Sequence, residues 1–240
     1  MIRALLALLF IVLFFIVTLP LMLILLIIRI KHSDAAERVA RPIIQWVFST
    51  IRRISLTRMD IKGTENIPDG PVLFVPNHLS IFDVVLLYPI LNRPSSFISK
   101  IELKKIPFLS QWMILIKAVF LDRNNIKQAI GIIKGAVDDI NNGTSVIVFP
   151  EGTRSRTGEV LEFKEGTFKI ATRTDCPVVP VAISNTDKIL HSGLGIRTAN
   201  ITIEFGRPII TKDLDKDQKK HLGHDARERI ITMKENIINN

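Results

Sequence analysis

A histidine and an aspartate five residues apart form the first group in the sequence that could do chemistry. His78 and Asp83 lie in the segment 76–83, PNHLSIFD. Along one unbroken helix, residues five apart are separated by roughly 140° and do not meet. A break after Pro76 and a helix start near Ser80 would let Asp83 fold back on the imidazole. A carboxylate on one ring nitrogen fixes the tautomer, so the other nitrogen can take a proton from a hydroxyl.

The same spacing also has a purely structural interpretation. Ser80 would cap the following helix, and Asp83, three residues later, would complete a loose capping box. The two roles are compatible, and spacing alone leaves both open.

A second group lies in the segment 149–156, FPEGTRSR, directly after the apolar run 146–149. Open α/β sheets place ligands at the carboxyl ends of their strands. Gly152 permits a close backbone approach and offers an N–H to an anion, and the planar fork of Arg154 suits phosphate. The alternative is a polar turn with an exposed Glu151–Arg154 pair, which would add little stability.

Two further cations follow predicted strands. Lys100 comes after the run 97–99, and Arg123 comes after the run 118–121 and Asp122. Cations that converge on one His–Asp pair indicate an anionic substrate more strongly than any of these pieces alone.

Short β-branched runs that alternate with helical stretches predict the elements that position these groups. The expected strands are 56–61, 72–75, 97–99, 119–121, 146–149, 178–183 and 201–205. The clearest helix between them is 126–141, and 211–238 is expected to form a terminal helix. This alternation predicts an α/β domain over residues 63–240, with a largely parallel central sheet flanked by helices.

Before this domain lies an apolar segment that predicts membrane attachment. Residues 4–28 carry no charge, and a helix of that length reaches roughly 37 Å, more than the ~30 Å hydrocarbon core of a bilayer. We expect residues 1–30 to be a membrane anchor, and Pro20 leaves open a re-entrant hairpin as well as a single span. Residues 31–62 are expected to form a basic amphipathic helix, clearest over 34–55, and a linker.

The charge distribution indicates the orientation of the chain and its partners. The formal net charge is +9, and residues 29–62 hold eight basic against three acidic side chains, whereas Arg3 alone precedes the apolar segment. This asymmetry places the domain on the cytoplasmic side of the cell membrane and favours contact with anionic phospholipids over a merely solvated helix face. With one tyrosine and no recognisable recognition motif, the sequence does not indicate nucleic-acid binding.

Metal and disulfide chemistry are not expected. The single cysteine, Cys176, has no partner for a disulfide or a thiolate zinc site. His221 and His224 stand on a Lys-rich stretch that is more typical of a solvated helix face than of a ligand pair.

Five ordered blocks resemble the glycerolipid acyltransferases, and in particular the 1-acylglycerol-3-phosphate acyltransferases. The blocks are Asn77-His78 with Asp83, Lys100 with Glu102-Leu103 and Ile106-Pro107, FLDR at 120–123, FPEGTRS at 149–155, and VPVAI at 179–183. The resemblance covers residues 60–205. It departs from the family pattern at Leu79, Ser110 and Ala118, where Gln, Gly and Gly are common, and each departure leaves the charged groups in place.

The resemblance implies a reaction and a role for each matched residue. His78, oriented by Asp83, would deprotonate the free hydroxyl of lysophosphatidic acid, whose oxygen attacks the thioester of acyl-CoA or acyl carrier protein to give phosphatidic acid. No cofactor or metal is implied. The expected substrate contacts are Glu151, Arg154 and Arg123 for the glycerol and phosphate, Lys100 and the Gly152 N–H for the oxyanion or phosphate, and Asn77 and Thr153 as further members of the binding site.

Other interpretations remain open. The acceptor could be glycerol 3-phosphate or another lysophospholipid, and lipopolysaccharide-type acyltransferases share the His–Asp spacing. The chain could also be an inactive lipid-binding module in the membrane. Apolar residues of the segment 101–113 are expected either to line an acyl-chain tunnel or to belong to the ordinary core.

Overall fold

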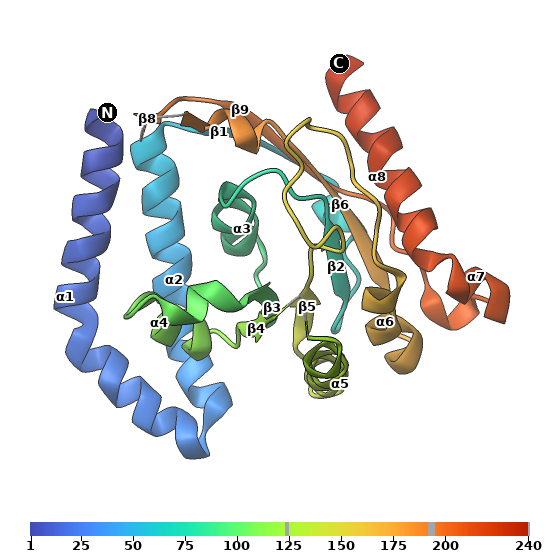
Figure 1. Cartoon of the computed structure of the whole chain (residues 1–240), viewed down its shortest axis with the longest axis horizontal. Helices are drawn as coiled ribbons and strands as arrows, with labels where there is room; N and C mark the ends of the chain where they lie inside the picture. The colour runs from blue at the N-terminus through green and yellow to red at the C-terminus, as the bar shows by residue number, and fades with distance from the viewer. Residues whose placement is uncertain (123–124, 192–194, 240) are drawn as a thin grey trace.

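Seven strands form the central sheet in the order β1-β9-β6-β2-β5-β3-β4. The structure, a computed structural model, describes residues 1–122, 125–191 and 195–239 (Figure 1). The strands are β1 (Arg58–Lys62), β2 (Leu73–Pro76), β3 (Ser95–Lys100), β4 (Val119–Leu121), β5 (Ser145–Ile147), β6 (Val178–Ser184) and β9 (Asn200–Phe205), and β7 (Leu190–His191) pairs separately with β8 (Gly195–Ile196). Neighbours in the large sheet are parallel except β6 and β9, which confirms the predicted largely parallel sheet.

Helices cover both faces of this sheet. The helices are α1 (Ile2–Lys31), α2 (Ser33–Ser55), α3 (Phe82–Leu87), α4 (Leu109–Leu115), α5 (Ile126–Asn141), α6 (Lys169–Thr174), α7 (Lys216–Lys220) and α8 (Leu222–Asn239). Strand side chains point alternately to the two faces. Phe74 therefore packs with the core under α1 to α4, while Leu73 and Val75 pack with the core under α5, α6 and α8. Every residue of β6 is buried, and a strand covered on both faces is accordingly rich in apolar residues.

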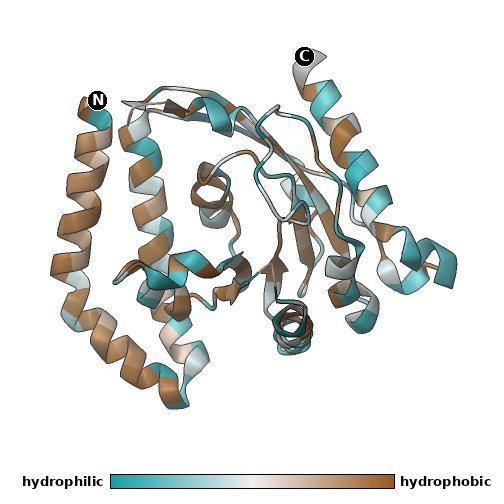
Figure 2. Ribbon diagram, in the orientation of Figure 1, coloured by the Kyte–Doolittle hydropathy of each residue, from teal (hydrophilic) through white to brown (hydrophobic). Residues whose placement is uncertain are grey.

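The apolar α1 folds back along α2 as one arm of a helical hairpin (Figure 1). The turn lies at His32, whereas the sequence indicated a possible turn at Pro20, which instead lies inside α1. Aromatic pairs fix the inner face of α1, with ring centroids 5.6 Å apart for Phe10–Trp46 and 5.3 Å apart for Phe14–Trp112. The outer face stays exposed, and only 17% of the most apolar window is buried. Figure 2 shows apolar residues along most of α1.

Two expected boundaries differ from the structure. β1 pairs with β9 at the edge of the sheet, so a domain boundary at residue 62 would separate β1 from the sheet to which it belongs. The single helix expected over 211–238 is divided into α7 and α8, because Asp215 caps α7 with a capping box and the chain turns at His221. Only the first difference enlarges the domain, which includes β1 as an edge strand.

Candidate active site

The predicted site residues meet at one edge of the sheet. β2, β3, β5 and β6 are parallel, so their carboxyl ends lie at the same edge. His78 follows β2, Glu151 and Arg154 follow the neighbouring β5, and Lys100 ends β3. The topology therefore places the two motifs side by side, as the sequence indicated.

His78 and Asp83 form the predicted pair. His78 Nδ1 lies 2.7 Å from Asp83 Oδ2, because the chain turns after β2 and α3 begins only at Phe82. Asp83 is fully buried, whereas the His78 side chain is 15% exposed. The imidazole also stacks on Phe149, with ring centroids 4.2 Å apart. With Nδ1 donating to the carboxylate, Nε2 is the basic nitrogen that can take a proton from a hydroxyl.

Four donors surround the Asp83 carboxylate. Besides His78, the Leu79 and Ser80 N–H groups donate to Oδ2 at 2.7 and 2.9 Å, and the Thr186 hydroxyl donates to Oδ1. The Ser80 hydroxyl accepts the Phe82 N–H at 3.3 Å, so the capping interpretation describes the same turn.

Thr186 had not been identified from the sequence as a site residue. It is fully buried and begins η5 (Thr186–Lys188), the turn that follows β6. Its position after a strand parallel to β2 was the signal that could have identified it.

Asn77 and Glu151 contact protein backbone, and their expected role as substrate contacts stays a prediction. Asn77 is fully buried, donates to the Ile183 carbonyl at 3.0 Å and accepts the Ile183 N–H at 2.7 Å. Glu151 is 5% exposed, and its Oε1 accepts the His78 N–H at 2.8 Å. Both side chains therefore hold the turn that carries His78.

Glu151 has an altered protonation equilibrium. Burial raises the pKa of its carboxyl from 4.5 to about 7, although the backbone N–H groups of His78 and Leu161 and the charge of Lys234 oppose part of this change. The carboxyl therefore changes charge near neutral pH, beside the turn that carries the candidate base.

The remaining residues of the second motif differ in how they are placed. Gly152 adopts φ +70°, and its N–H donates to the Phe149 carbonyl at 3.0 Å, so this N–H is not directed at an anion as expected. Thr153 and Arg154 are exposed. A Cβ on Gly152 would lie 2.8 Å from the Lys164 ammonium, which adds a cation that the sequence analysis missed.

Of the other two expected cations, the structure describes only Lys100. Lys100 is exposed at the end of β3 and forms an ion pair with Glu102 at 2.7 Å. Arg123 lies outside the described residues.

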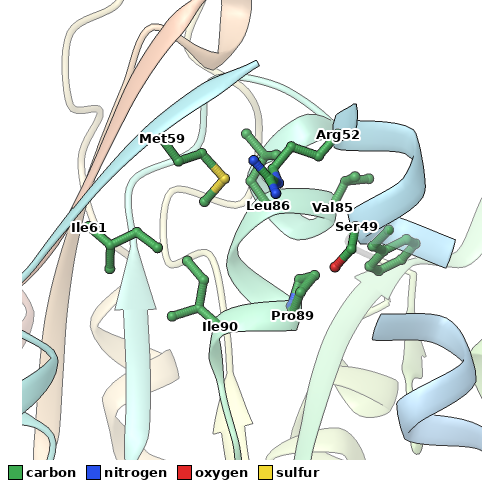
Figure 3. Close-up of a pocket in the computed structure, with 9 residues that line it drawn as sticks. Ser49, Arg52, Met59, Ile61, Val85, Leu86, Pro89 and Ile90 are labelled. Carbon is green, nitrogen blue, oxygen red and sulfur yellow. The ribbon is translucent and has the colours of Figure 1, made fainter. Parts of the chain in front are cut away.

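Within the segment 101–113, only the end belongs to the core, and the segment contacts α1. Trp112 and Met113 are buried, and Phe108, although 39% exposed, stacks on Phe15 at 5.9 Å. A hollow of ≈340 Å³ lies elsewhere, between α2, β1 and α3 (Figure 3). Its lining residues are Phe48, Ser49, Arg52, Met59, Ile61, Val85, Leu86, Pro89 and Ile90. None of these lining residues belongs to the segment 101–113, and the buried Trp112 and Met113 fit the core interpretation.

A metal centre is not evident in the described part of the chain, where no group of three or more His, Cys, Asp or Glu side chains could hold an ion. The chemistry available at this edge is that of a base, a buried carboxylate and nearby cations.

Residues 58–184, which hold both motifs, match the Acyltransferase family. The chain belongs to this family. It is 32% identical over 202 residues to the 1-acyl-sn-glycerol-3-phosphate acyltransferase of Saccharomyces cerevisiae, which covers 80% of this chain and 66% of the yeast protein. It is also 32% identical over 201 residues to a probable 1-acyl-sn-glycerol-3-phosphate acyltransferase of Mycoplasma pneumoniae, covering 79% of this chain and 74% of that protein.

The fold agrees with a solved member of this family. The crystal structure of the 1-acyl-sn-glycerophosphate (LPA) acyltransferase PlsC from Thermotoga maritima superposes with a TM-score of 0.73 at 26% identity, covering 97% of both chains. Some curated acyltransferases are longer, since this chain spans 66% of the yeast protein and 47% of a chloroplastic relative from Brassica napus.

Replacing Thr186 tests its role in holding Asp83. Thr186→Val keeps the shape but leaves Asp83 Oδ1 without this donor, and losing a hydrogen bond to a buried carboxylate costs about 1–3 kcal/mol. If the carboxylate orients the base, we expect kcat for acyl transfer to fall roughly tenfold. Thr186→Ser, which retains the hydroxyl, should be close to wild type, and equal losses in the two variants would contradict the role.

Replacing Glu151 tests its titration. Because its pKa is about 7 in the folded protein and 4.5 as the reference value, this carboxyl binds more protons when folded, so its contribution to stability declines as pH rises from 4.5 to 7. Glu151→Gln should flatten the fall in melting temperature between pH 5 and pH 8. The exposed Glu162→Gln on the same loop should retain the wild-type slope, and a Glu151→Gln slope equal to wild type would refute the assignment.

Proposed function

We propose that this protein transfers a fatty acyl group to the free hydroxyl of 1-acylglycerol 3-phosphate, giving phosphatidic acid for phospholipid synthesis. The observation that carries the proposal is the 2.7 Å contact of His78 with a buried Asp83, beside a loop with exposed Arg154 and Lys164. The names of the yeast and Mycoplasma relatives, which specify 1-acyl-sn-glycerol 3-phosphate, support this choice of acceptor.

In the proposed reaction, His78 Nε2 takes the proton from the acceptor hydroxyl as its oxygen attacks the carbonyl carbon of the donor thioester. The tetrahedral intermediate collapses, the carbon–sulfur bond breaks, and the imidazolium returns the proton to the departing thiolate. Asp83 keeps the imidazole in one tautomer and stabilises its charge during this step. The donor is acyl-CoA or acyl carrier protein, and neither a metal nor a cofactor takes part.

Cations around the pair suit the anionic substrates. Arg154 and Lys164 lie on the loop after β5, and Lys100 lies at the end of β3. A guanidinium can bind a phosphate with two parallel hydrogen bonds. We assign the acceptor phosphate to Arg154, with Lys164 and Lys100 as further cations. Arg123, which lies outside the described residues, is kept as a phosphate contact on the basis of its sequence motif alone.

Membrane association brings the enzyme to its acceptor, because a lysophospholipid with one acyl chain resides in the bilayer. The exposed apolar face of α1 would lie in the interface of the cell membrane, with both arms of the hairpin on the cytoplasmic side. Arg29 and Lys31 lie in the last turn of α1, and Arg38 and Arg41 lie in α2. Anionic lipid headgroups attract such residues by about 1 kcal/mol each.

The first test is an assay of acceptors. Detergent-solubilised protein is incubated with oleoyl-CoA, or with an acylated carrier protein, and with lysophosphatidic acid, glycerol 3-phosphate or lysophosphatidylcholine, while thiol release and lipid product are followed. We expect phosphatidic acid from lysophosphatidic acid. His78→Ala should lower the rate by at least about a hundredfold and leave association with vesicles intact, because the general base is removed.

The outcomes separate the alternatives. Activity on another acceptor alone would contradict the proposed acceptor within the same family. Silence with every acceptor and both donors would favour an inactive lipid-binding module, and a fully active His78→Ala variant would refute the assigned base.

Replacing Arg154 tests the phosphate assignment. Arg154→Ala should raise the KM for lysophosphatidic acid about tenfold or more with a smaller change in kcat, because it removes binding that ground state and transition state share. The control is Arg156→Ala, an exposed arginine on the same loop. An unchanged KM in Arg154→Ala would exclude this role.

A further inference from the structure

The loop that carries Glu151 and Arg154 has no regular structure of its own. Residues 150–164, all within the described part of the chain, lie between β5 and η4 (Glu165–Phe168) and form neither helix nor strand. The ends of the loop meet, since the Lys164 N–H donates to the Pro150 carbonyl at 3.0 Å. A long irregular segment keeps one shape only where other elements bind its backbone.

α8 runs beside this loop (Figure 1) and supplies those contacts. Arg227 donates from Nε to the Leu161 carbonyl at 3.0 Å and from Nη2 to the Val160 carbonyl at 2.9 Å. Lys234 donates from Nζ to the Gly158 carbonyl at 2.7 Å. Since Arg227 and Lys234 are seven residues apart, about two helical turns, they lie on the same face of α8.

The far end of the loop holds α8 in turn. The Glu165 carboxylate accepts the Gly223 and His224 N–H groups at 3.1 Å each, at the N-terminus of α8. A Cβ on Gly223 would lie 2.7 Å from this carboxylate, so a side chain there would displace it. The loop and α8 therefore form one connected unit.

Lys234 differs from Arg227 in the charges that surround it. Burial lowers the pKa of the Lys234 ammonium, and the charges of Glu151 in the loop, Asp187 in η5 and Asp83 in α3 oppose the change. The positive charge of Lys234 therefore acts on carboxylates of the site, and its donated hydrogen bond holds the loop at Gly158.

We propose that Lys234 is a positioning residue for acyl transfer, whose ammonium fixes the loop at Gly158 and balances the negative charge of Glu151, the residue that accepts the His78 N–H. The proposal rests on the proposed function for its kinetic test but not for its structural one. Lys234 lies outside residues 58–184, so the match to the family does not include it.

The variants separate charge from packing. Lys234→Met keeps the length of the side chain but loses charge and donor, and Lys234→Arg restores both. The matched control is Arg229→Met on the same helix, because Arg229 is exposed and donates to the Arg207 carbonyl, outside the loop. Far-UV circular dichroism confirms folding, and Lys234→Gln, which keeps a donor, replaces Lys234→Met if the latter does not fold.

We expect Lys234→Met to lower kcat about tenfold with lysophosphatidic acid as acceptor, Lys234→Arg to recover most of this loss, and Arg229→Met to stay within twofold of wild type. If Lys234 acts through Glu151, Lys234→Met should cost clearly less in a Glu151→Gln background than alone. Equal losses in Lys234→Met and Lys234→Arg, or additive effects with Glu151→Gln, would overturn the proposal.

Hydrogen exchange gives a result that does not depend on catalysis. Amides 152–160 should exchange faster in Lys234→Met than in wild type or Arg229→Met, and unchanged exchange would overturn the positioning role. A wild-type protein without activity, combined with faster exchange in Lys234→Met, would instead reject the proposed function and retain the contact between α8 and the loop.

Discussion

The buried carboxylate of Asp83 is the constraint on which the site depends. A carboxylate removed from water has to find donors inside the protein, since an unpaired buried charge costs several kcal/mol. Those donors come from two segments: the turn after β2, which carries the His78 ring and the Leu79 and Ser80 N–H groups, and the turn after β6, which carries Thr186. They can converge because β2 and β6 are parallel neighbours whose carboxyl ends coincide. The parallel pairing of β2 and β6 therefore allows the protein both to satisfy the buried Asp83 carboxylate and to orient the His78 base.

The strand on the other side of β2 completes the support of His78. β5 leads into Phe149, whose ring stacks on the imidazole, and into Glu151, which accepts the His78 N–H. Asn77 meanwhile bonds in both directions to Ile183 of β6. The base is thus fixed by its ring, its backbone and its preceding residue, from both neighbouring strands. Such support limits the motion that would otherwise weaken a proton transfer.

Sequence patterns predicted those parts of the molecule that depend on residue type and spacing. Buried strands with helices on both faces are rich in β-branched residues, so all seven strands of the sheet were located, and the turn between Pro76 and Phe82 made the His78–Asp83 contact predictable. The type of a residue does not determine the direction in which its side chain points. Asn77 and Glu151 are polar residues in a motif, yet they face backbone.

Partners distant in the chain escaped prediction for a related reason. Thr186 and Lys234 are separated from Asp83 and Gly158 by more than seventy residues, and only the folded sheet and α8 bring them together.

In the hairpin of α1 and α2, one face of the apolar α1 packs against the protein and the other face stays exposed. A helix that crossed the bilayer away from the domain would leave Trp46 and Trp112 without Phe10 and Phe14, and aromatic side chains contribute much of the apolar area that such contacts bury. Docking keeps those contacts and leaves the outer apolar face of α1 exposed. In the membrane association proposed above, the helix would lie along the membrane surface rather than across it, and the domain would stay close to the bilayer. An acceptor held in the membrane by one acyl chain could then reach His78 without leaving the lipid.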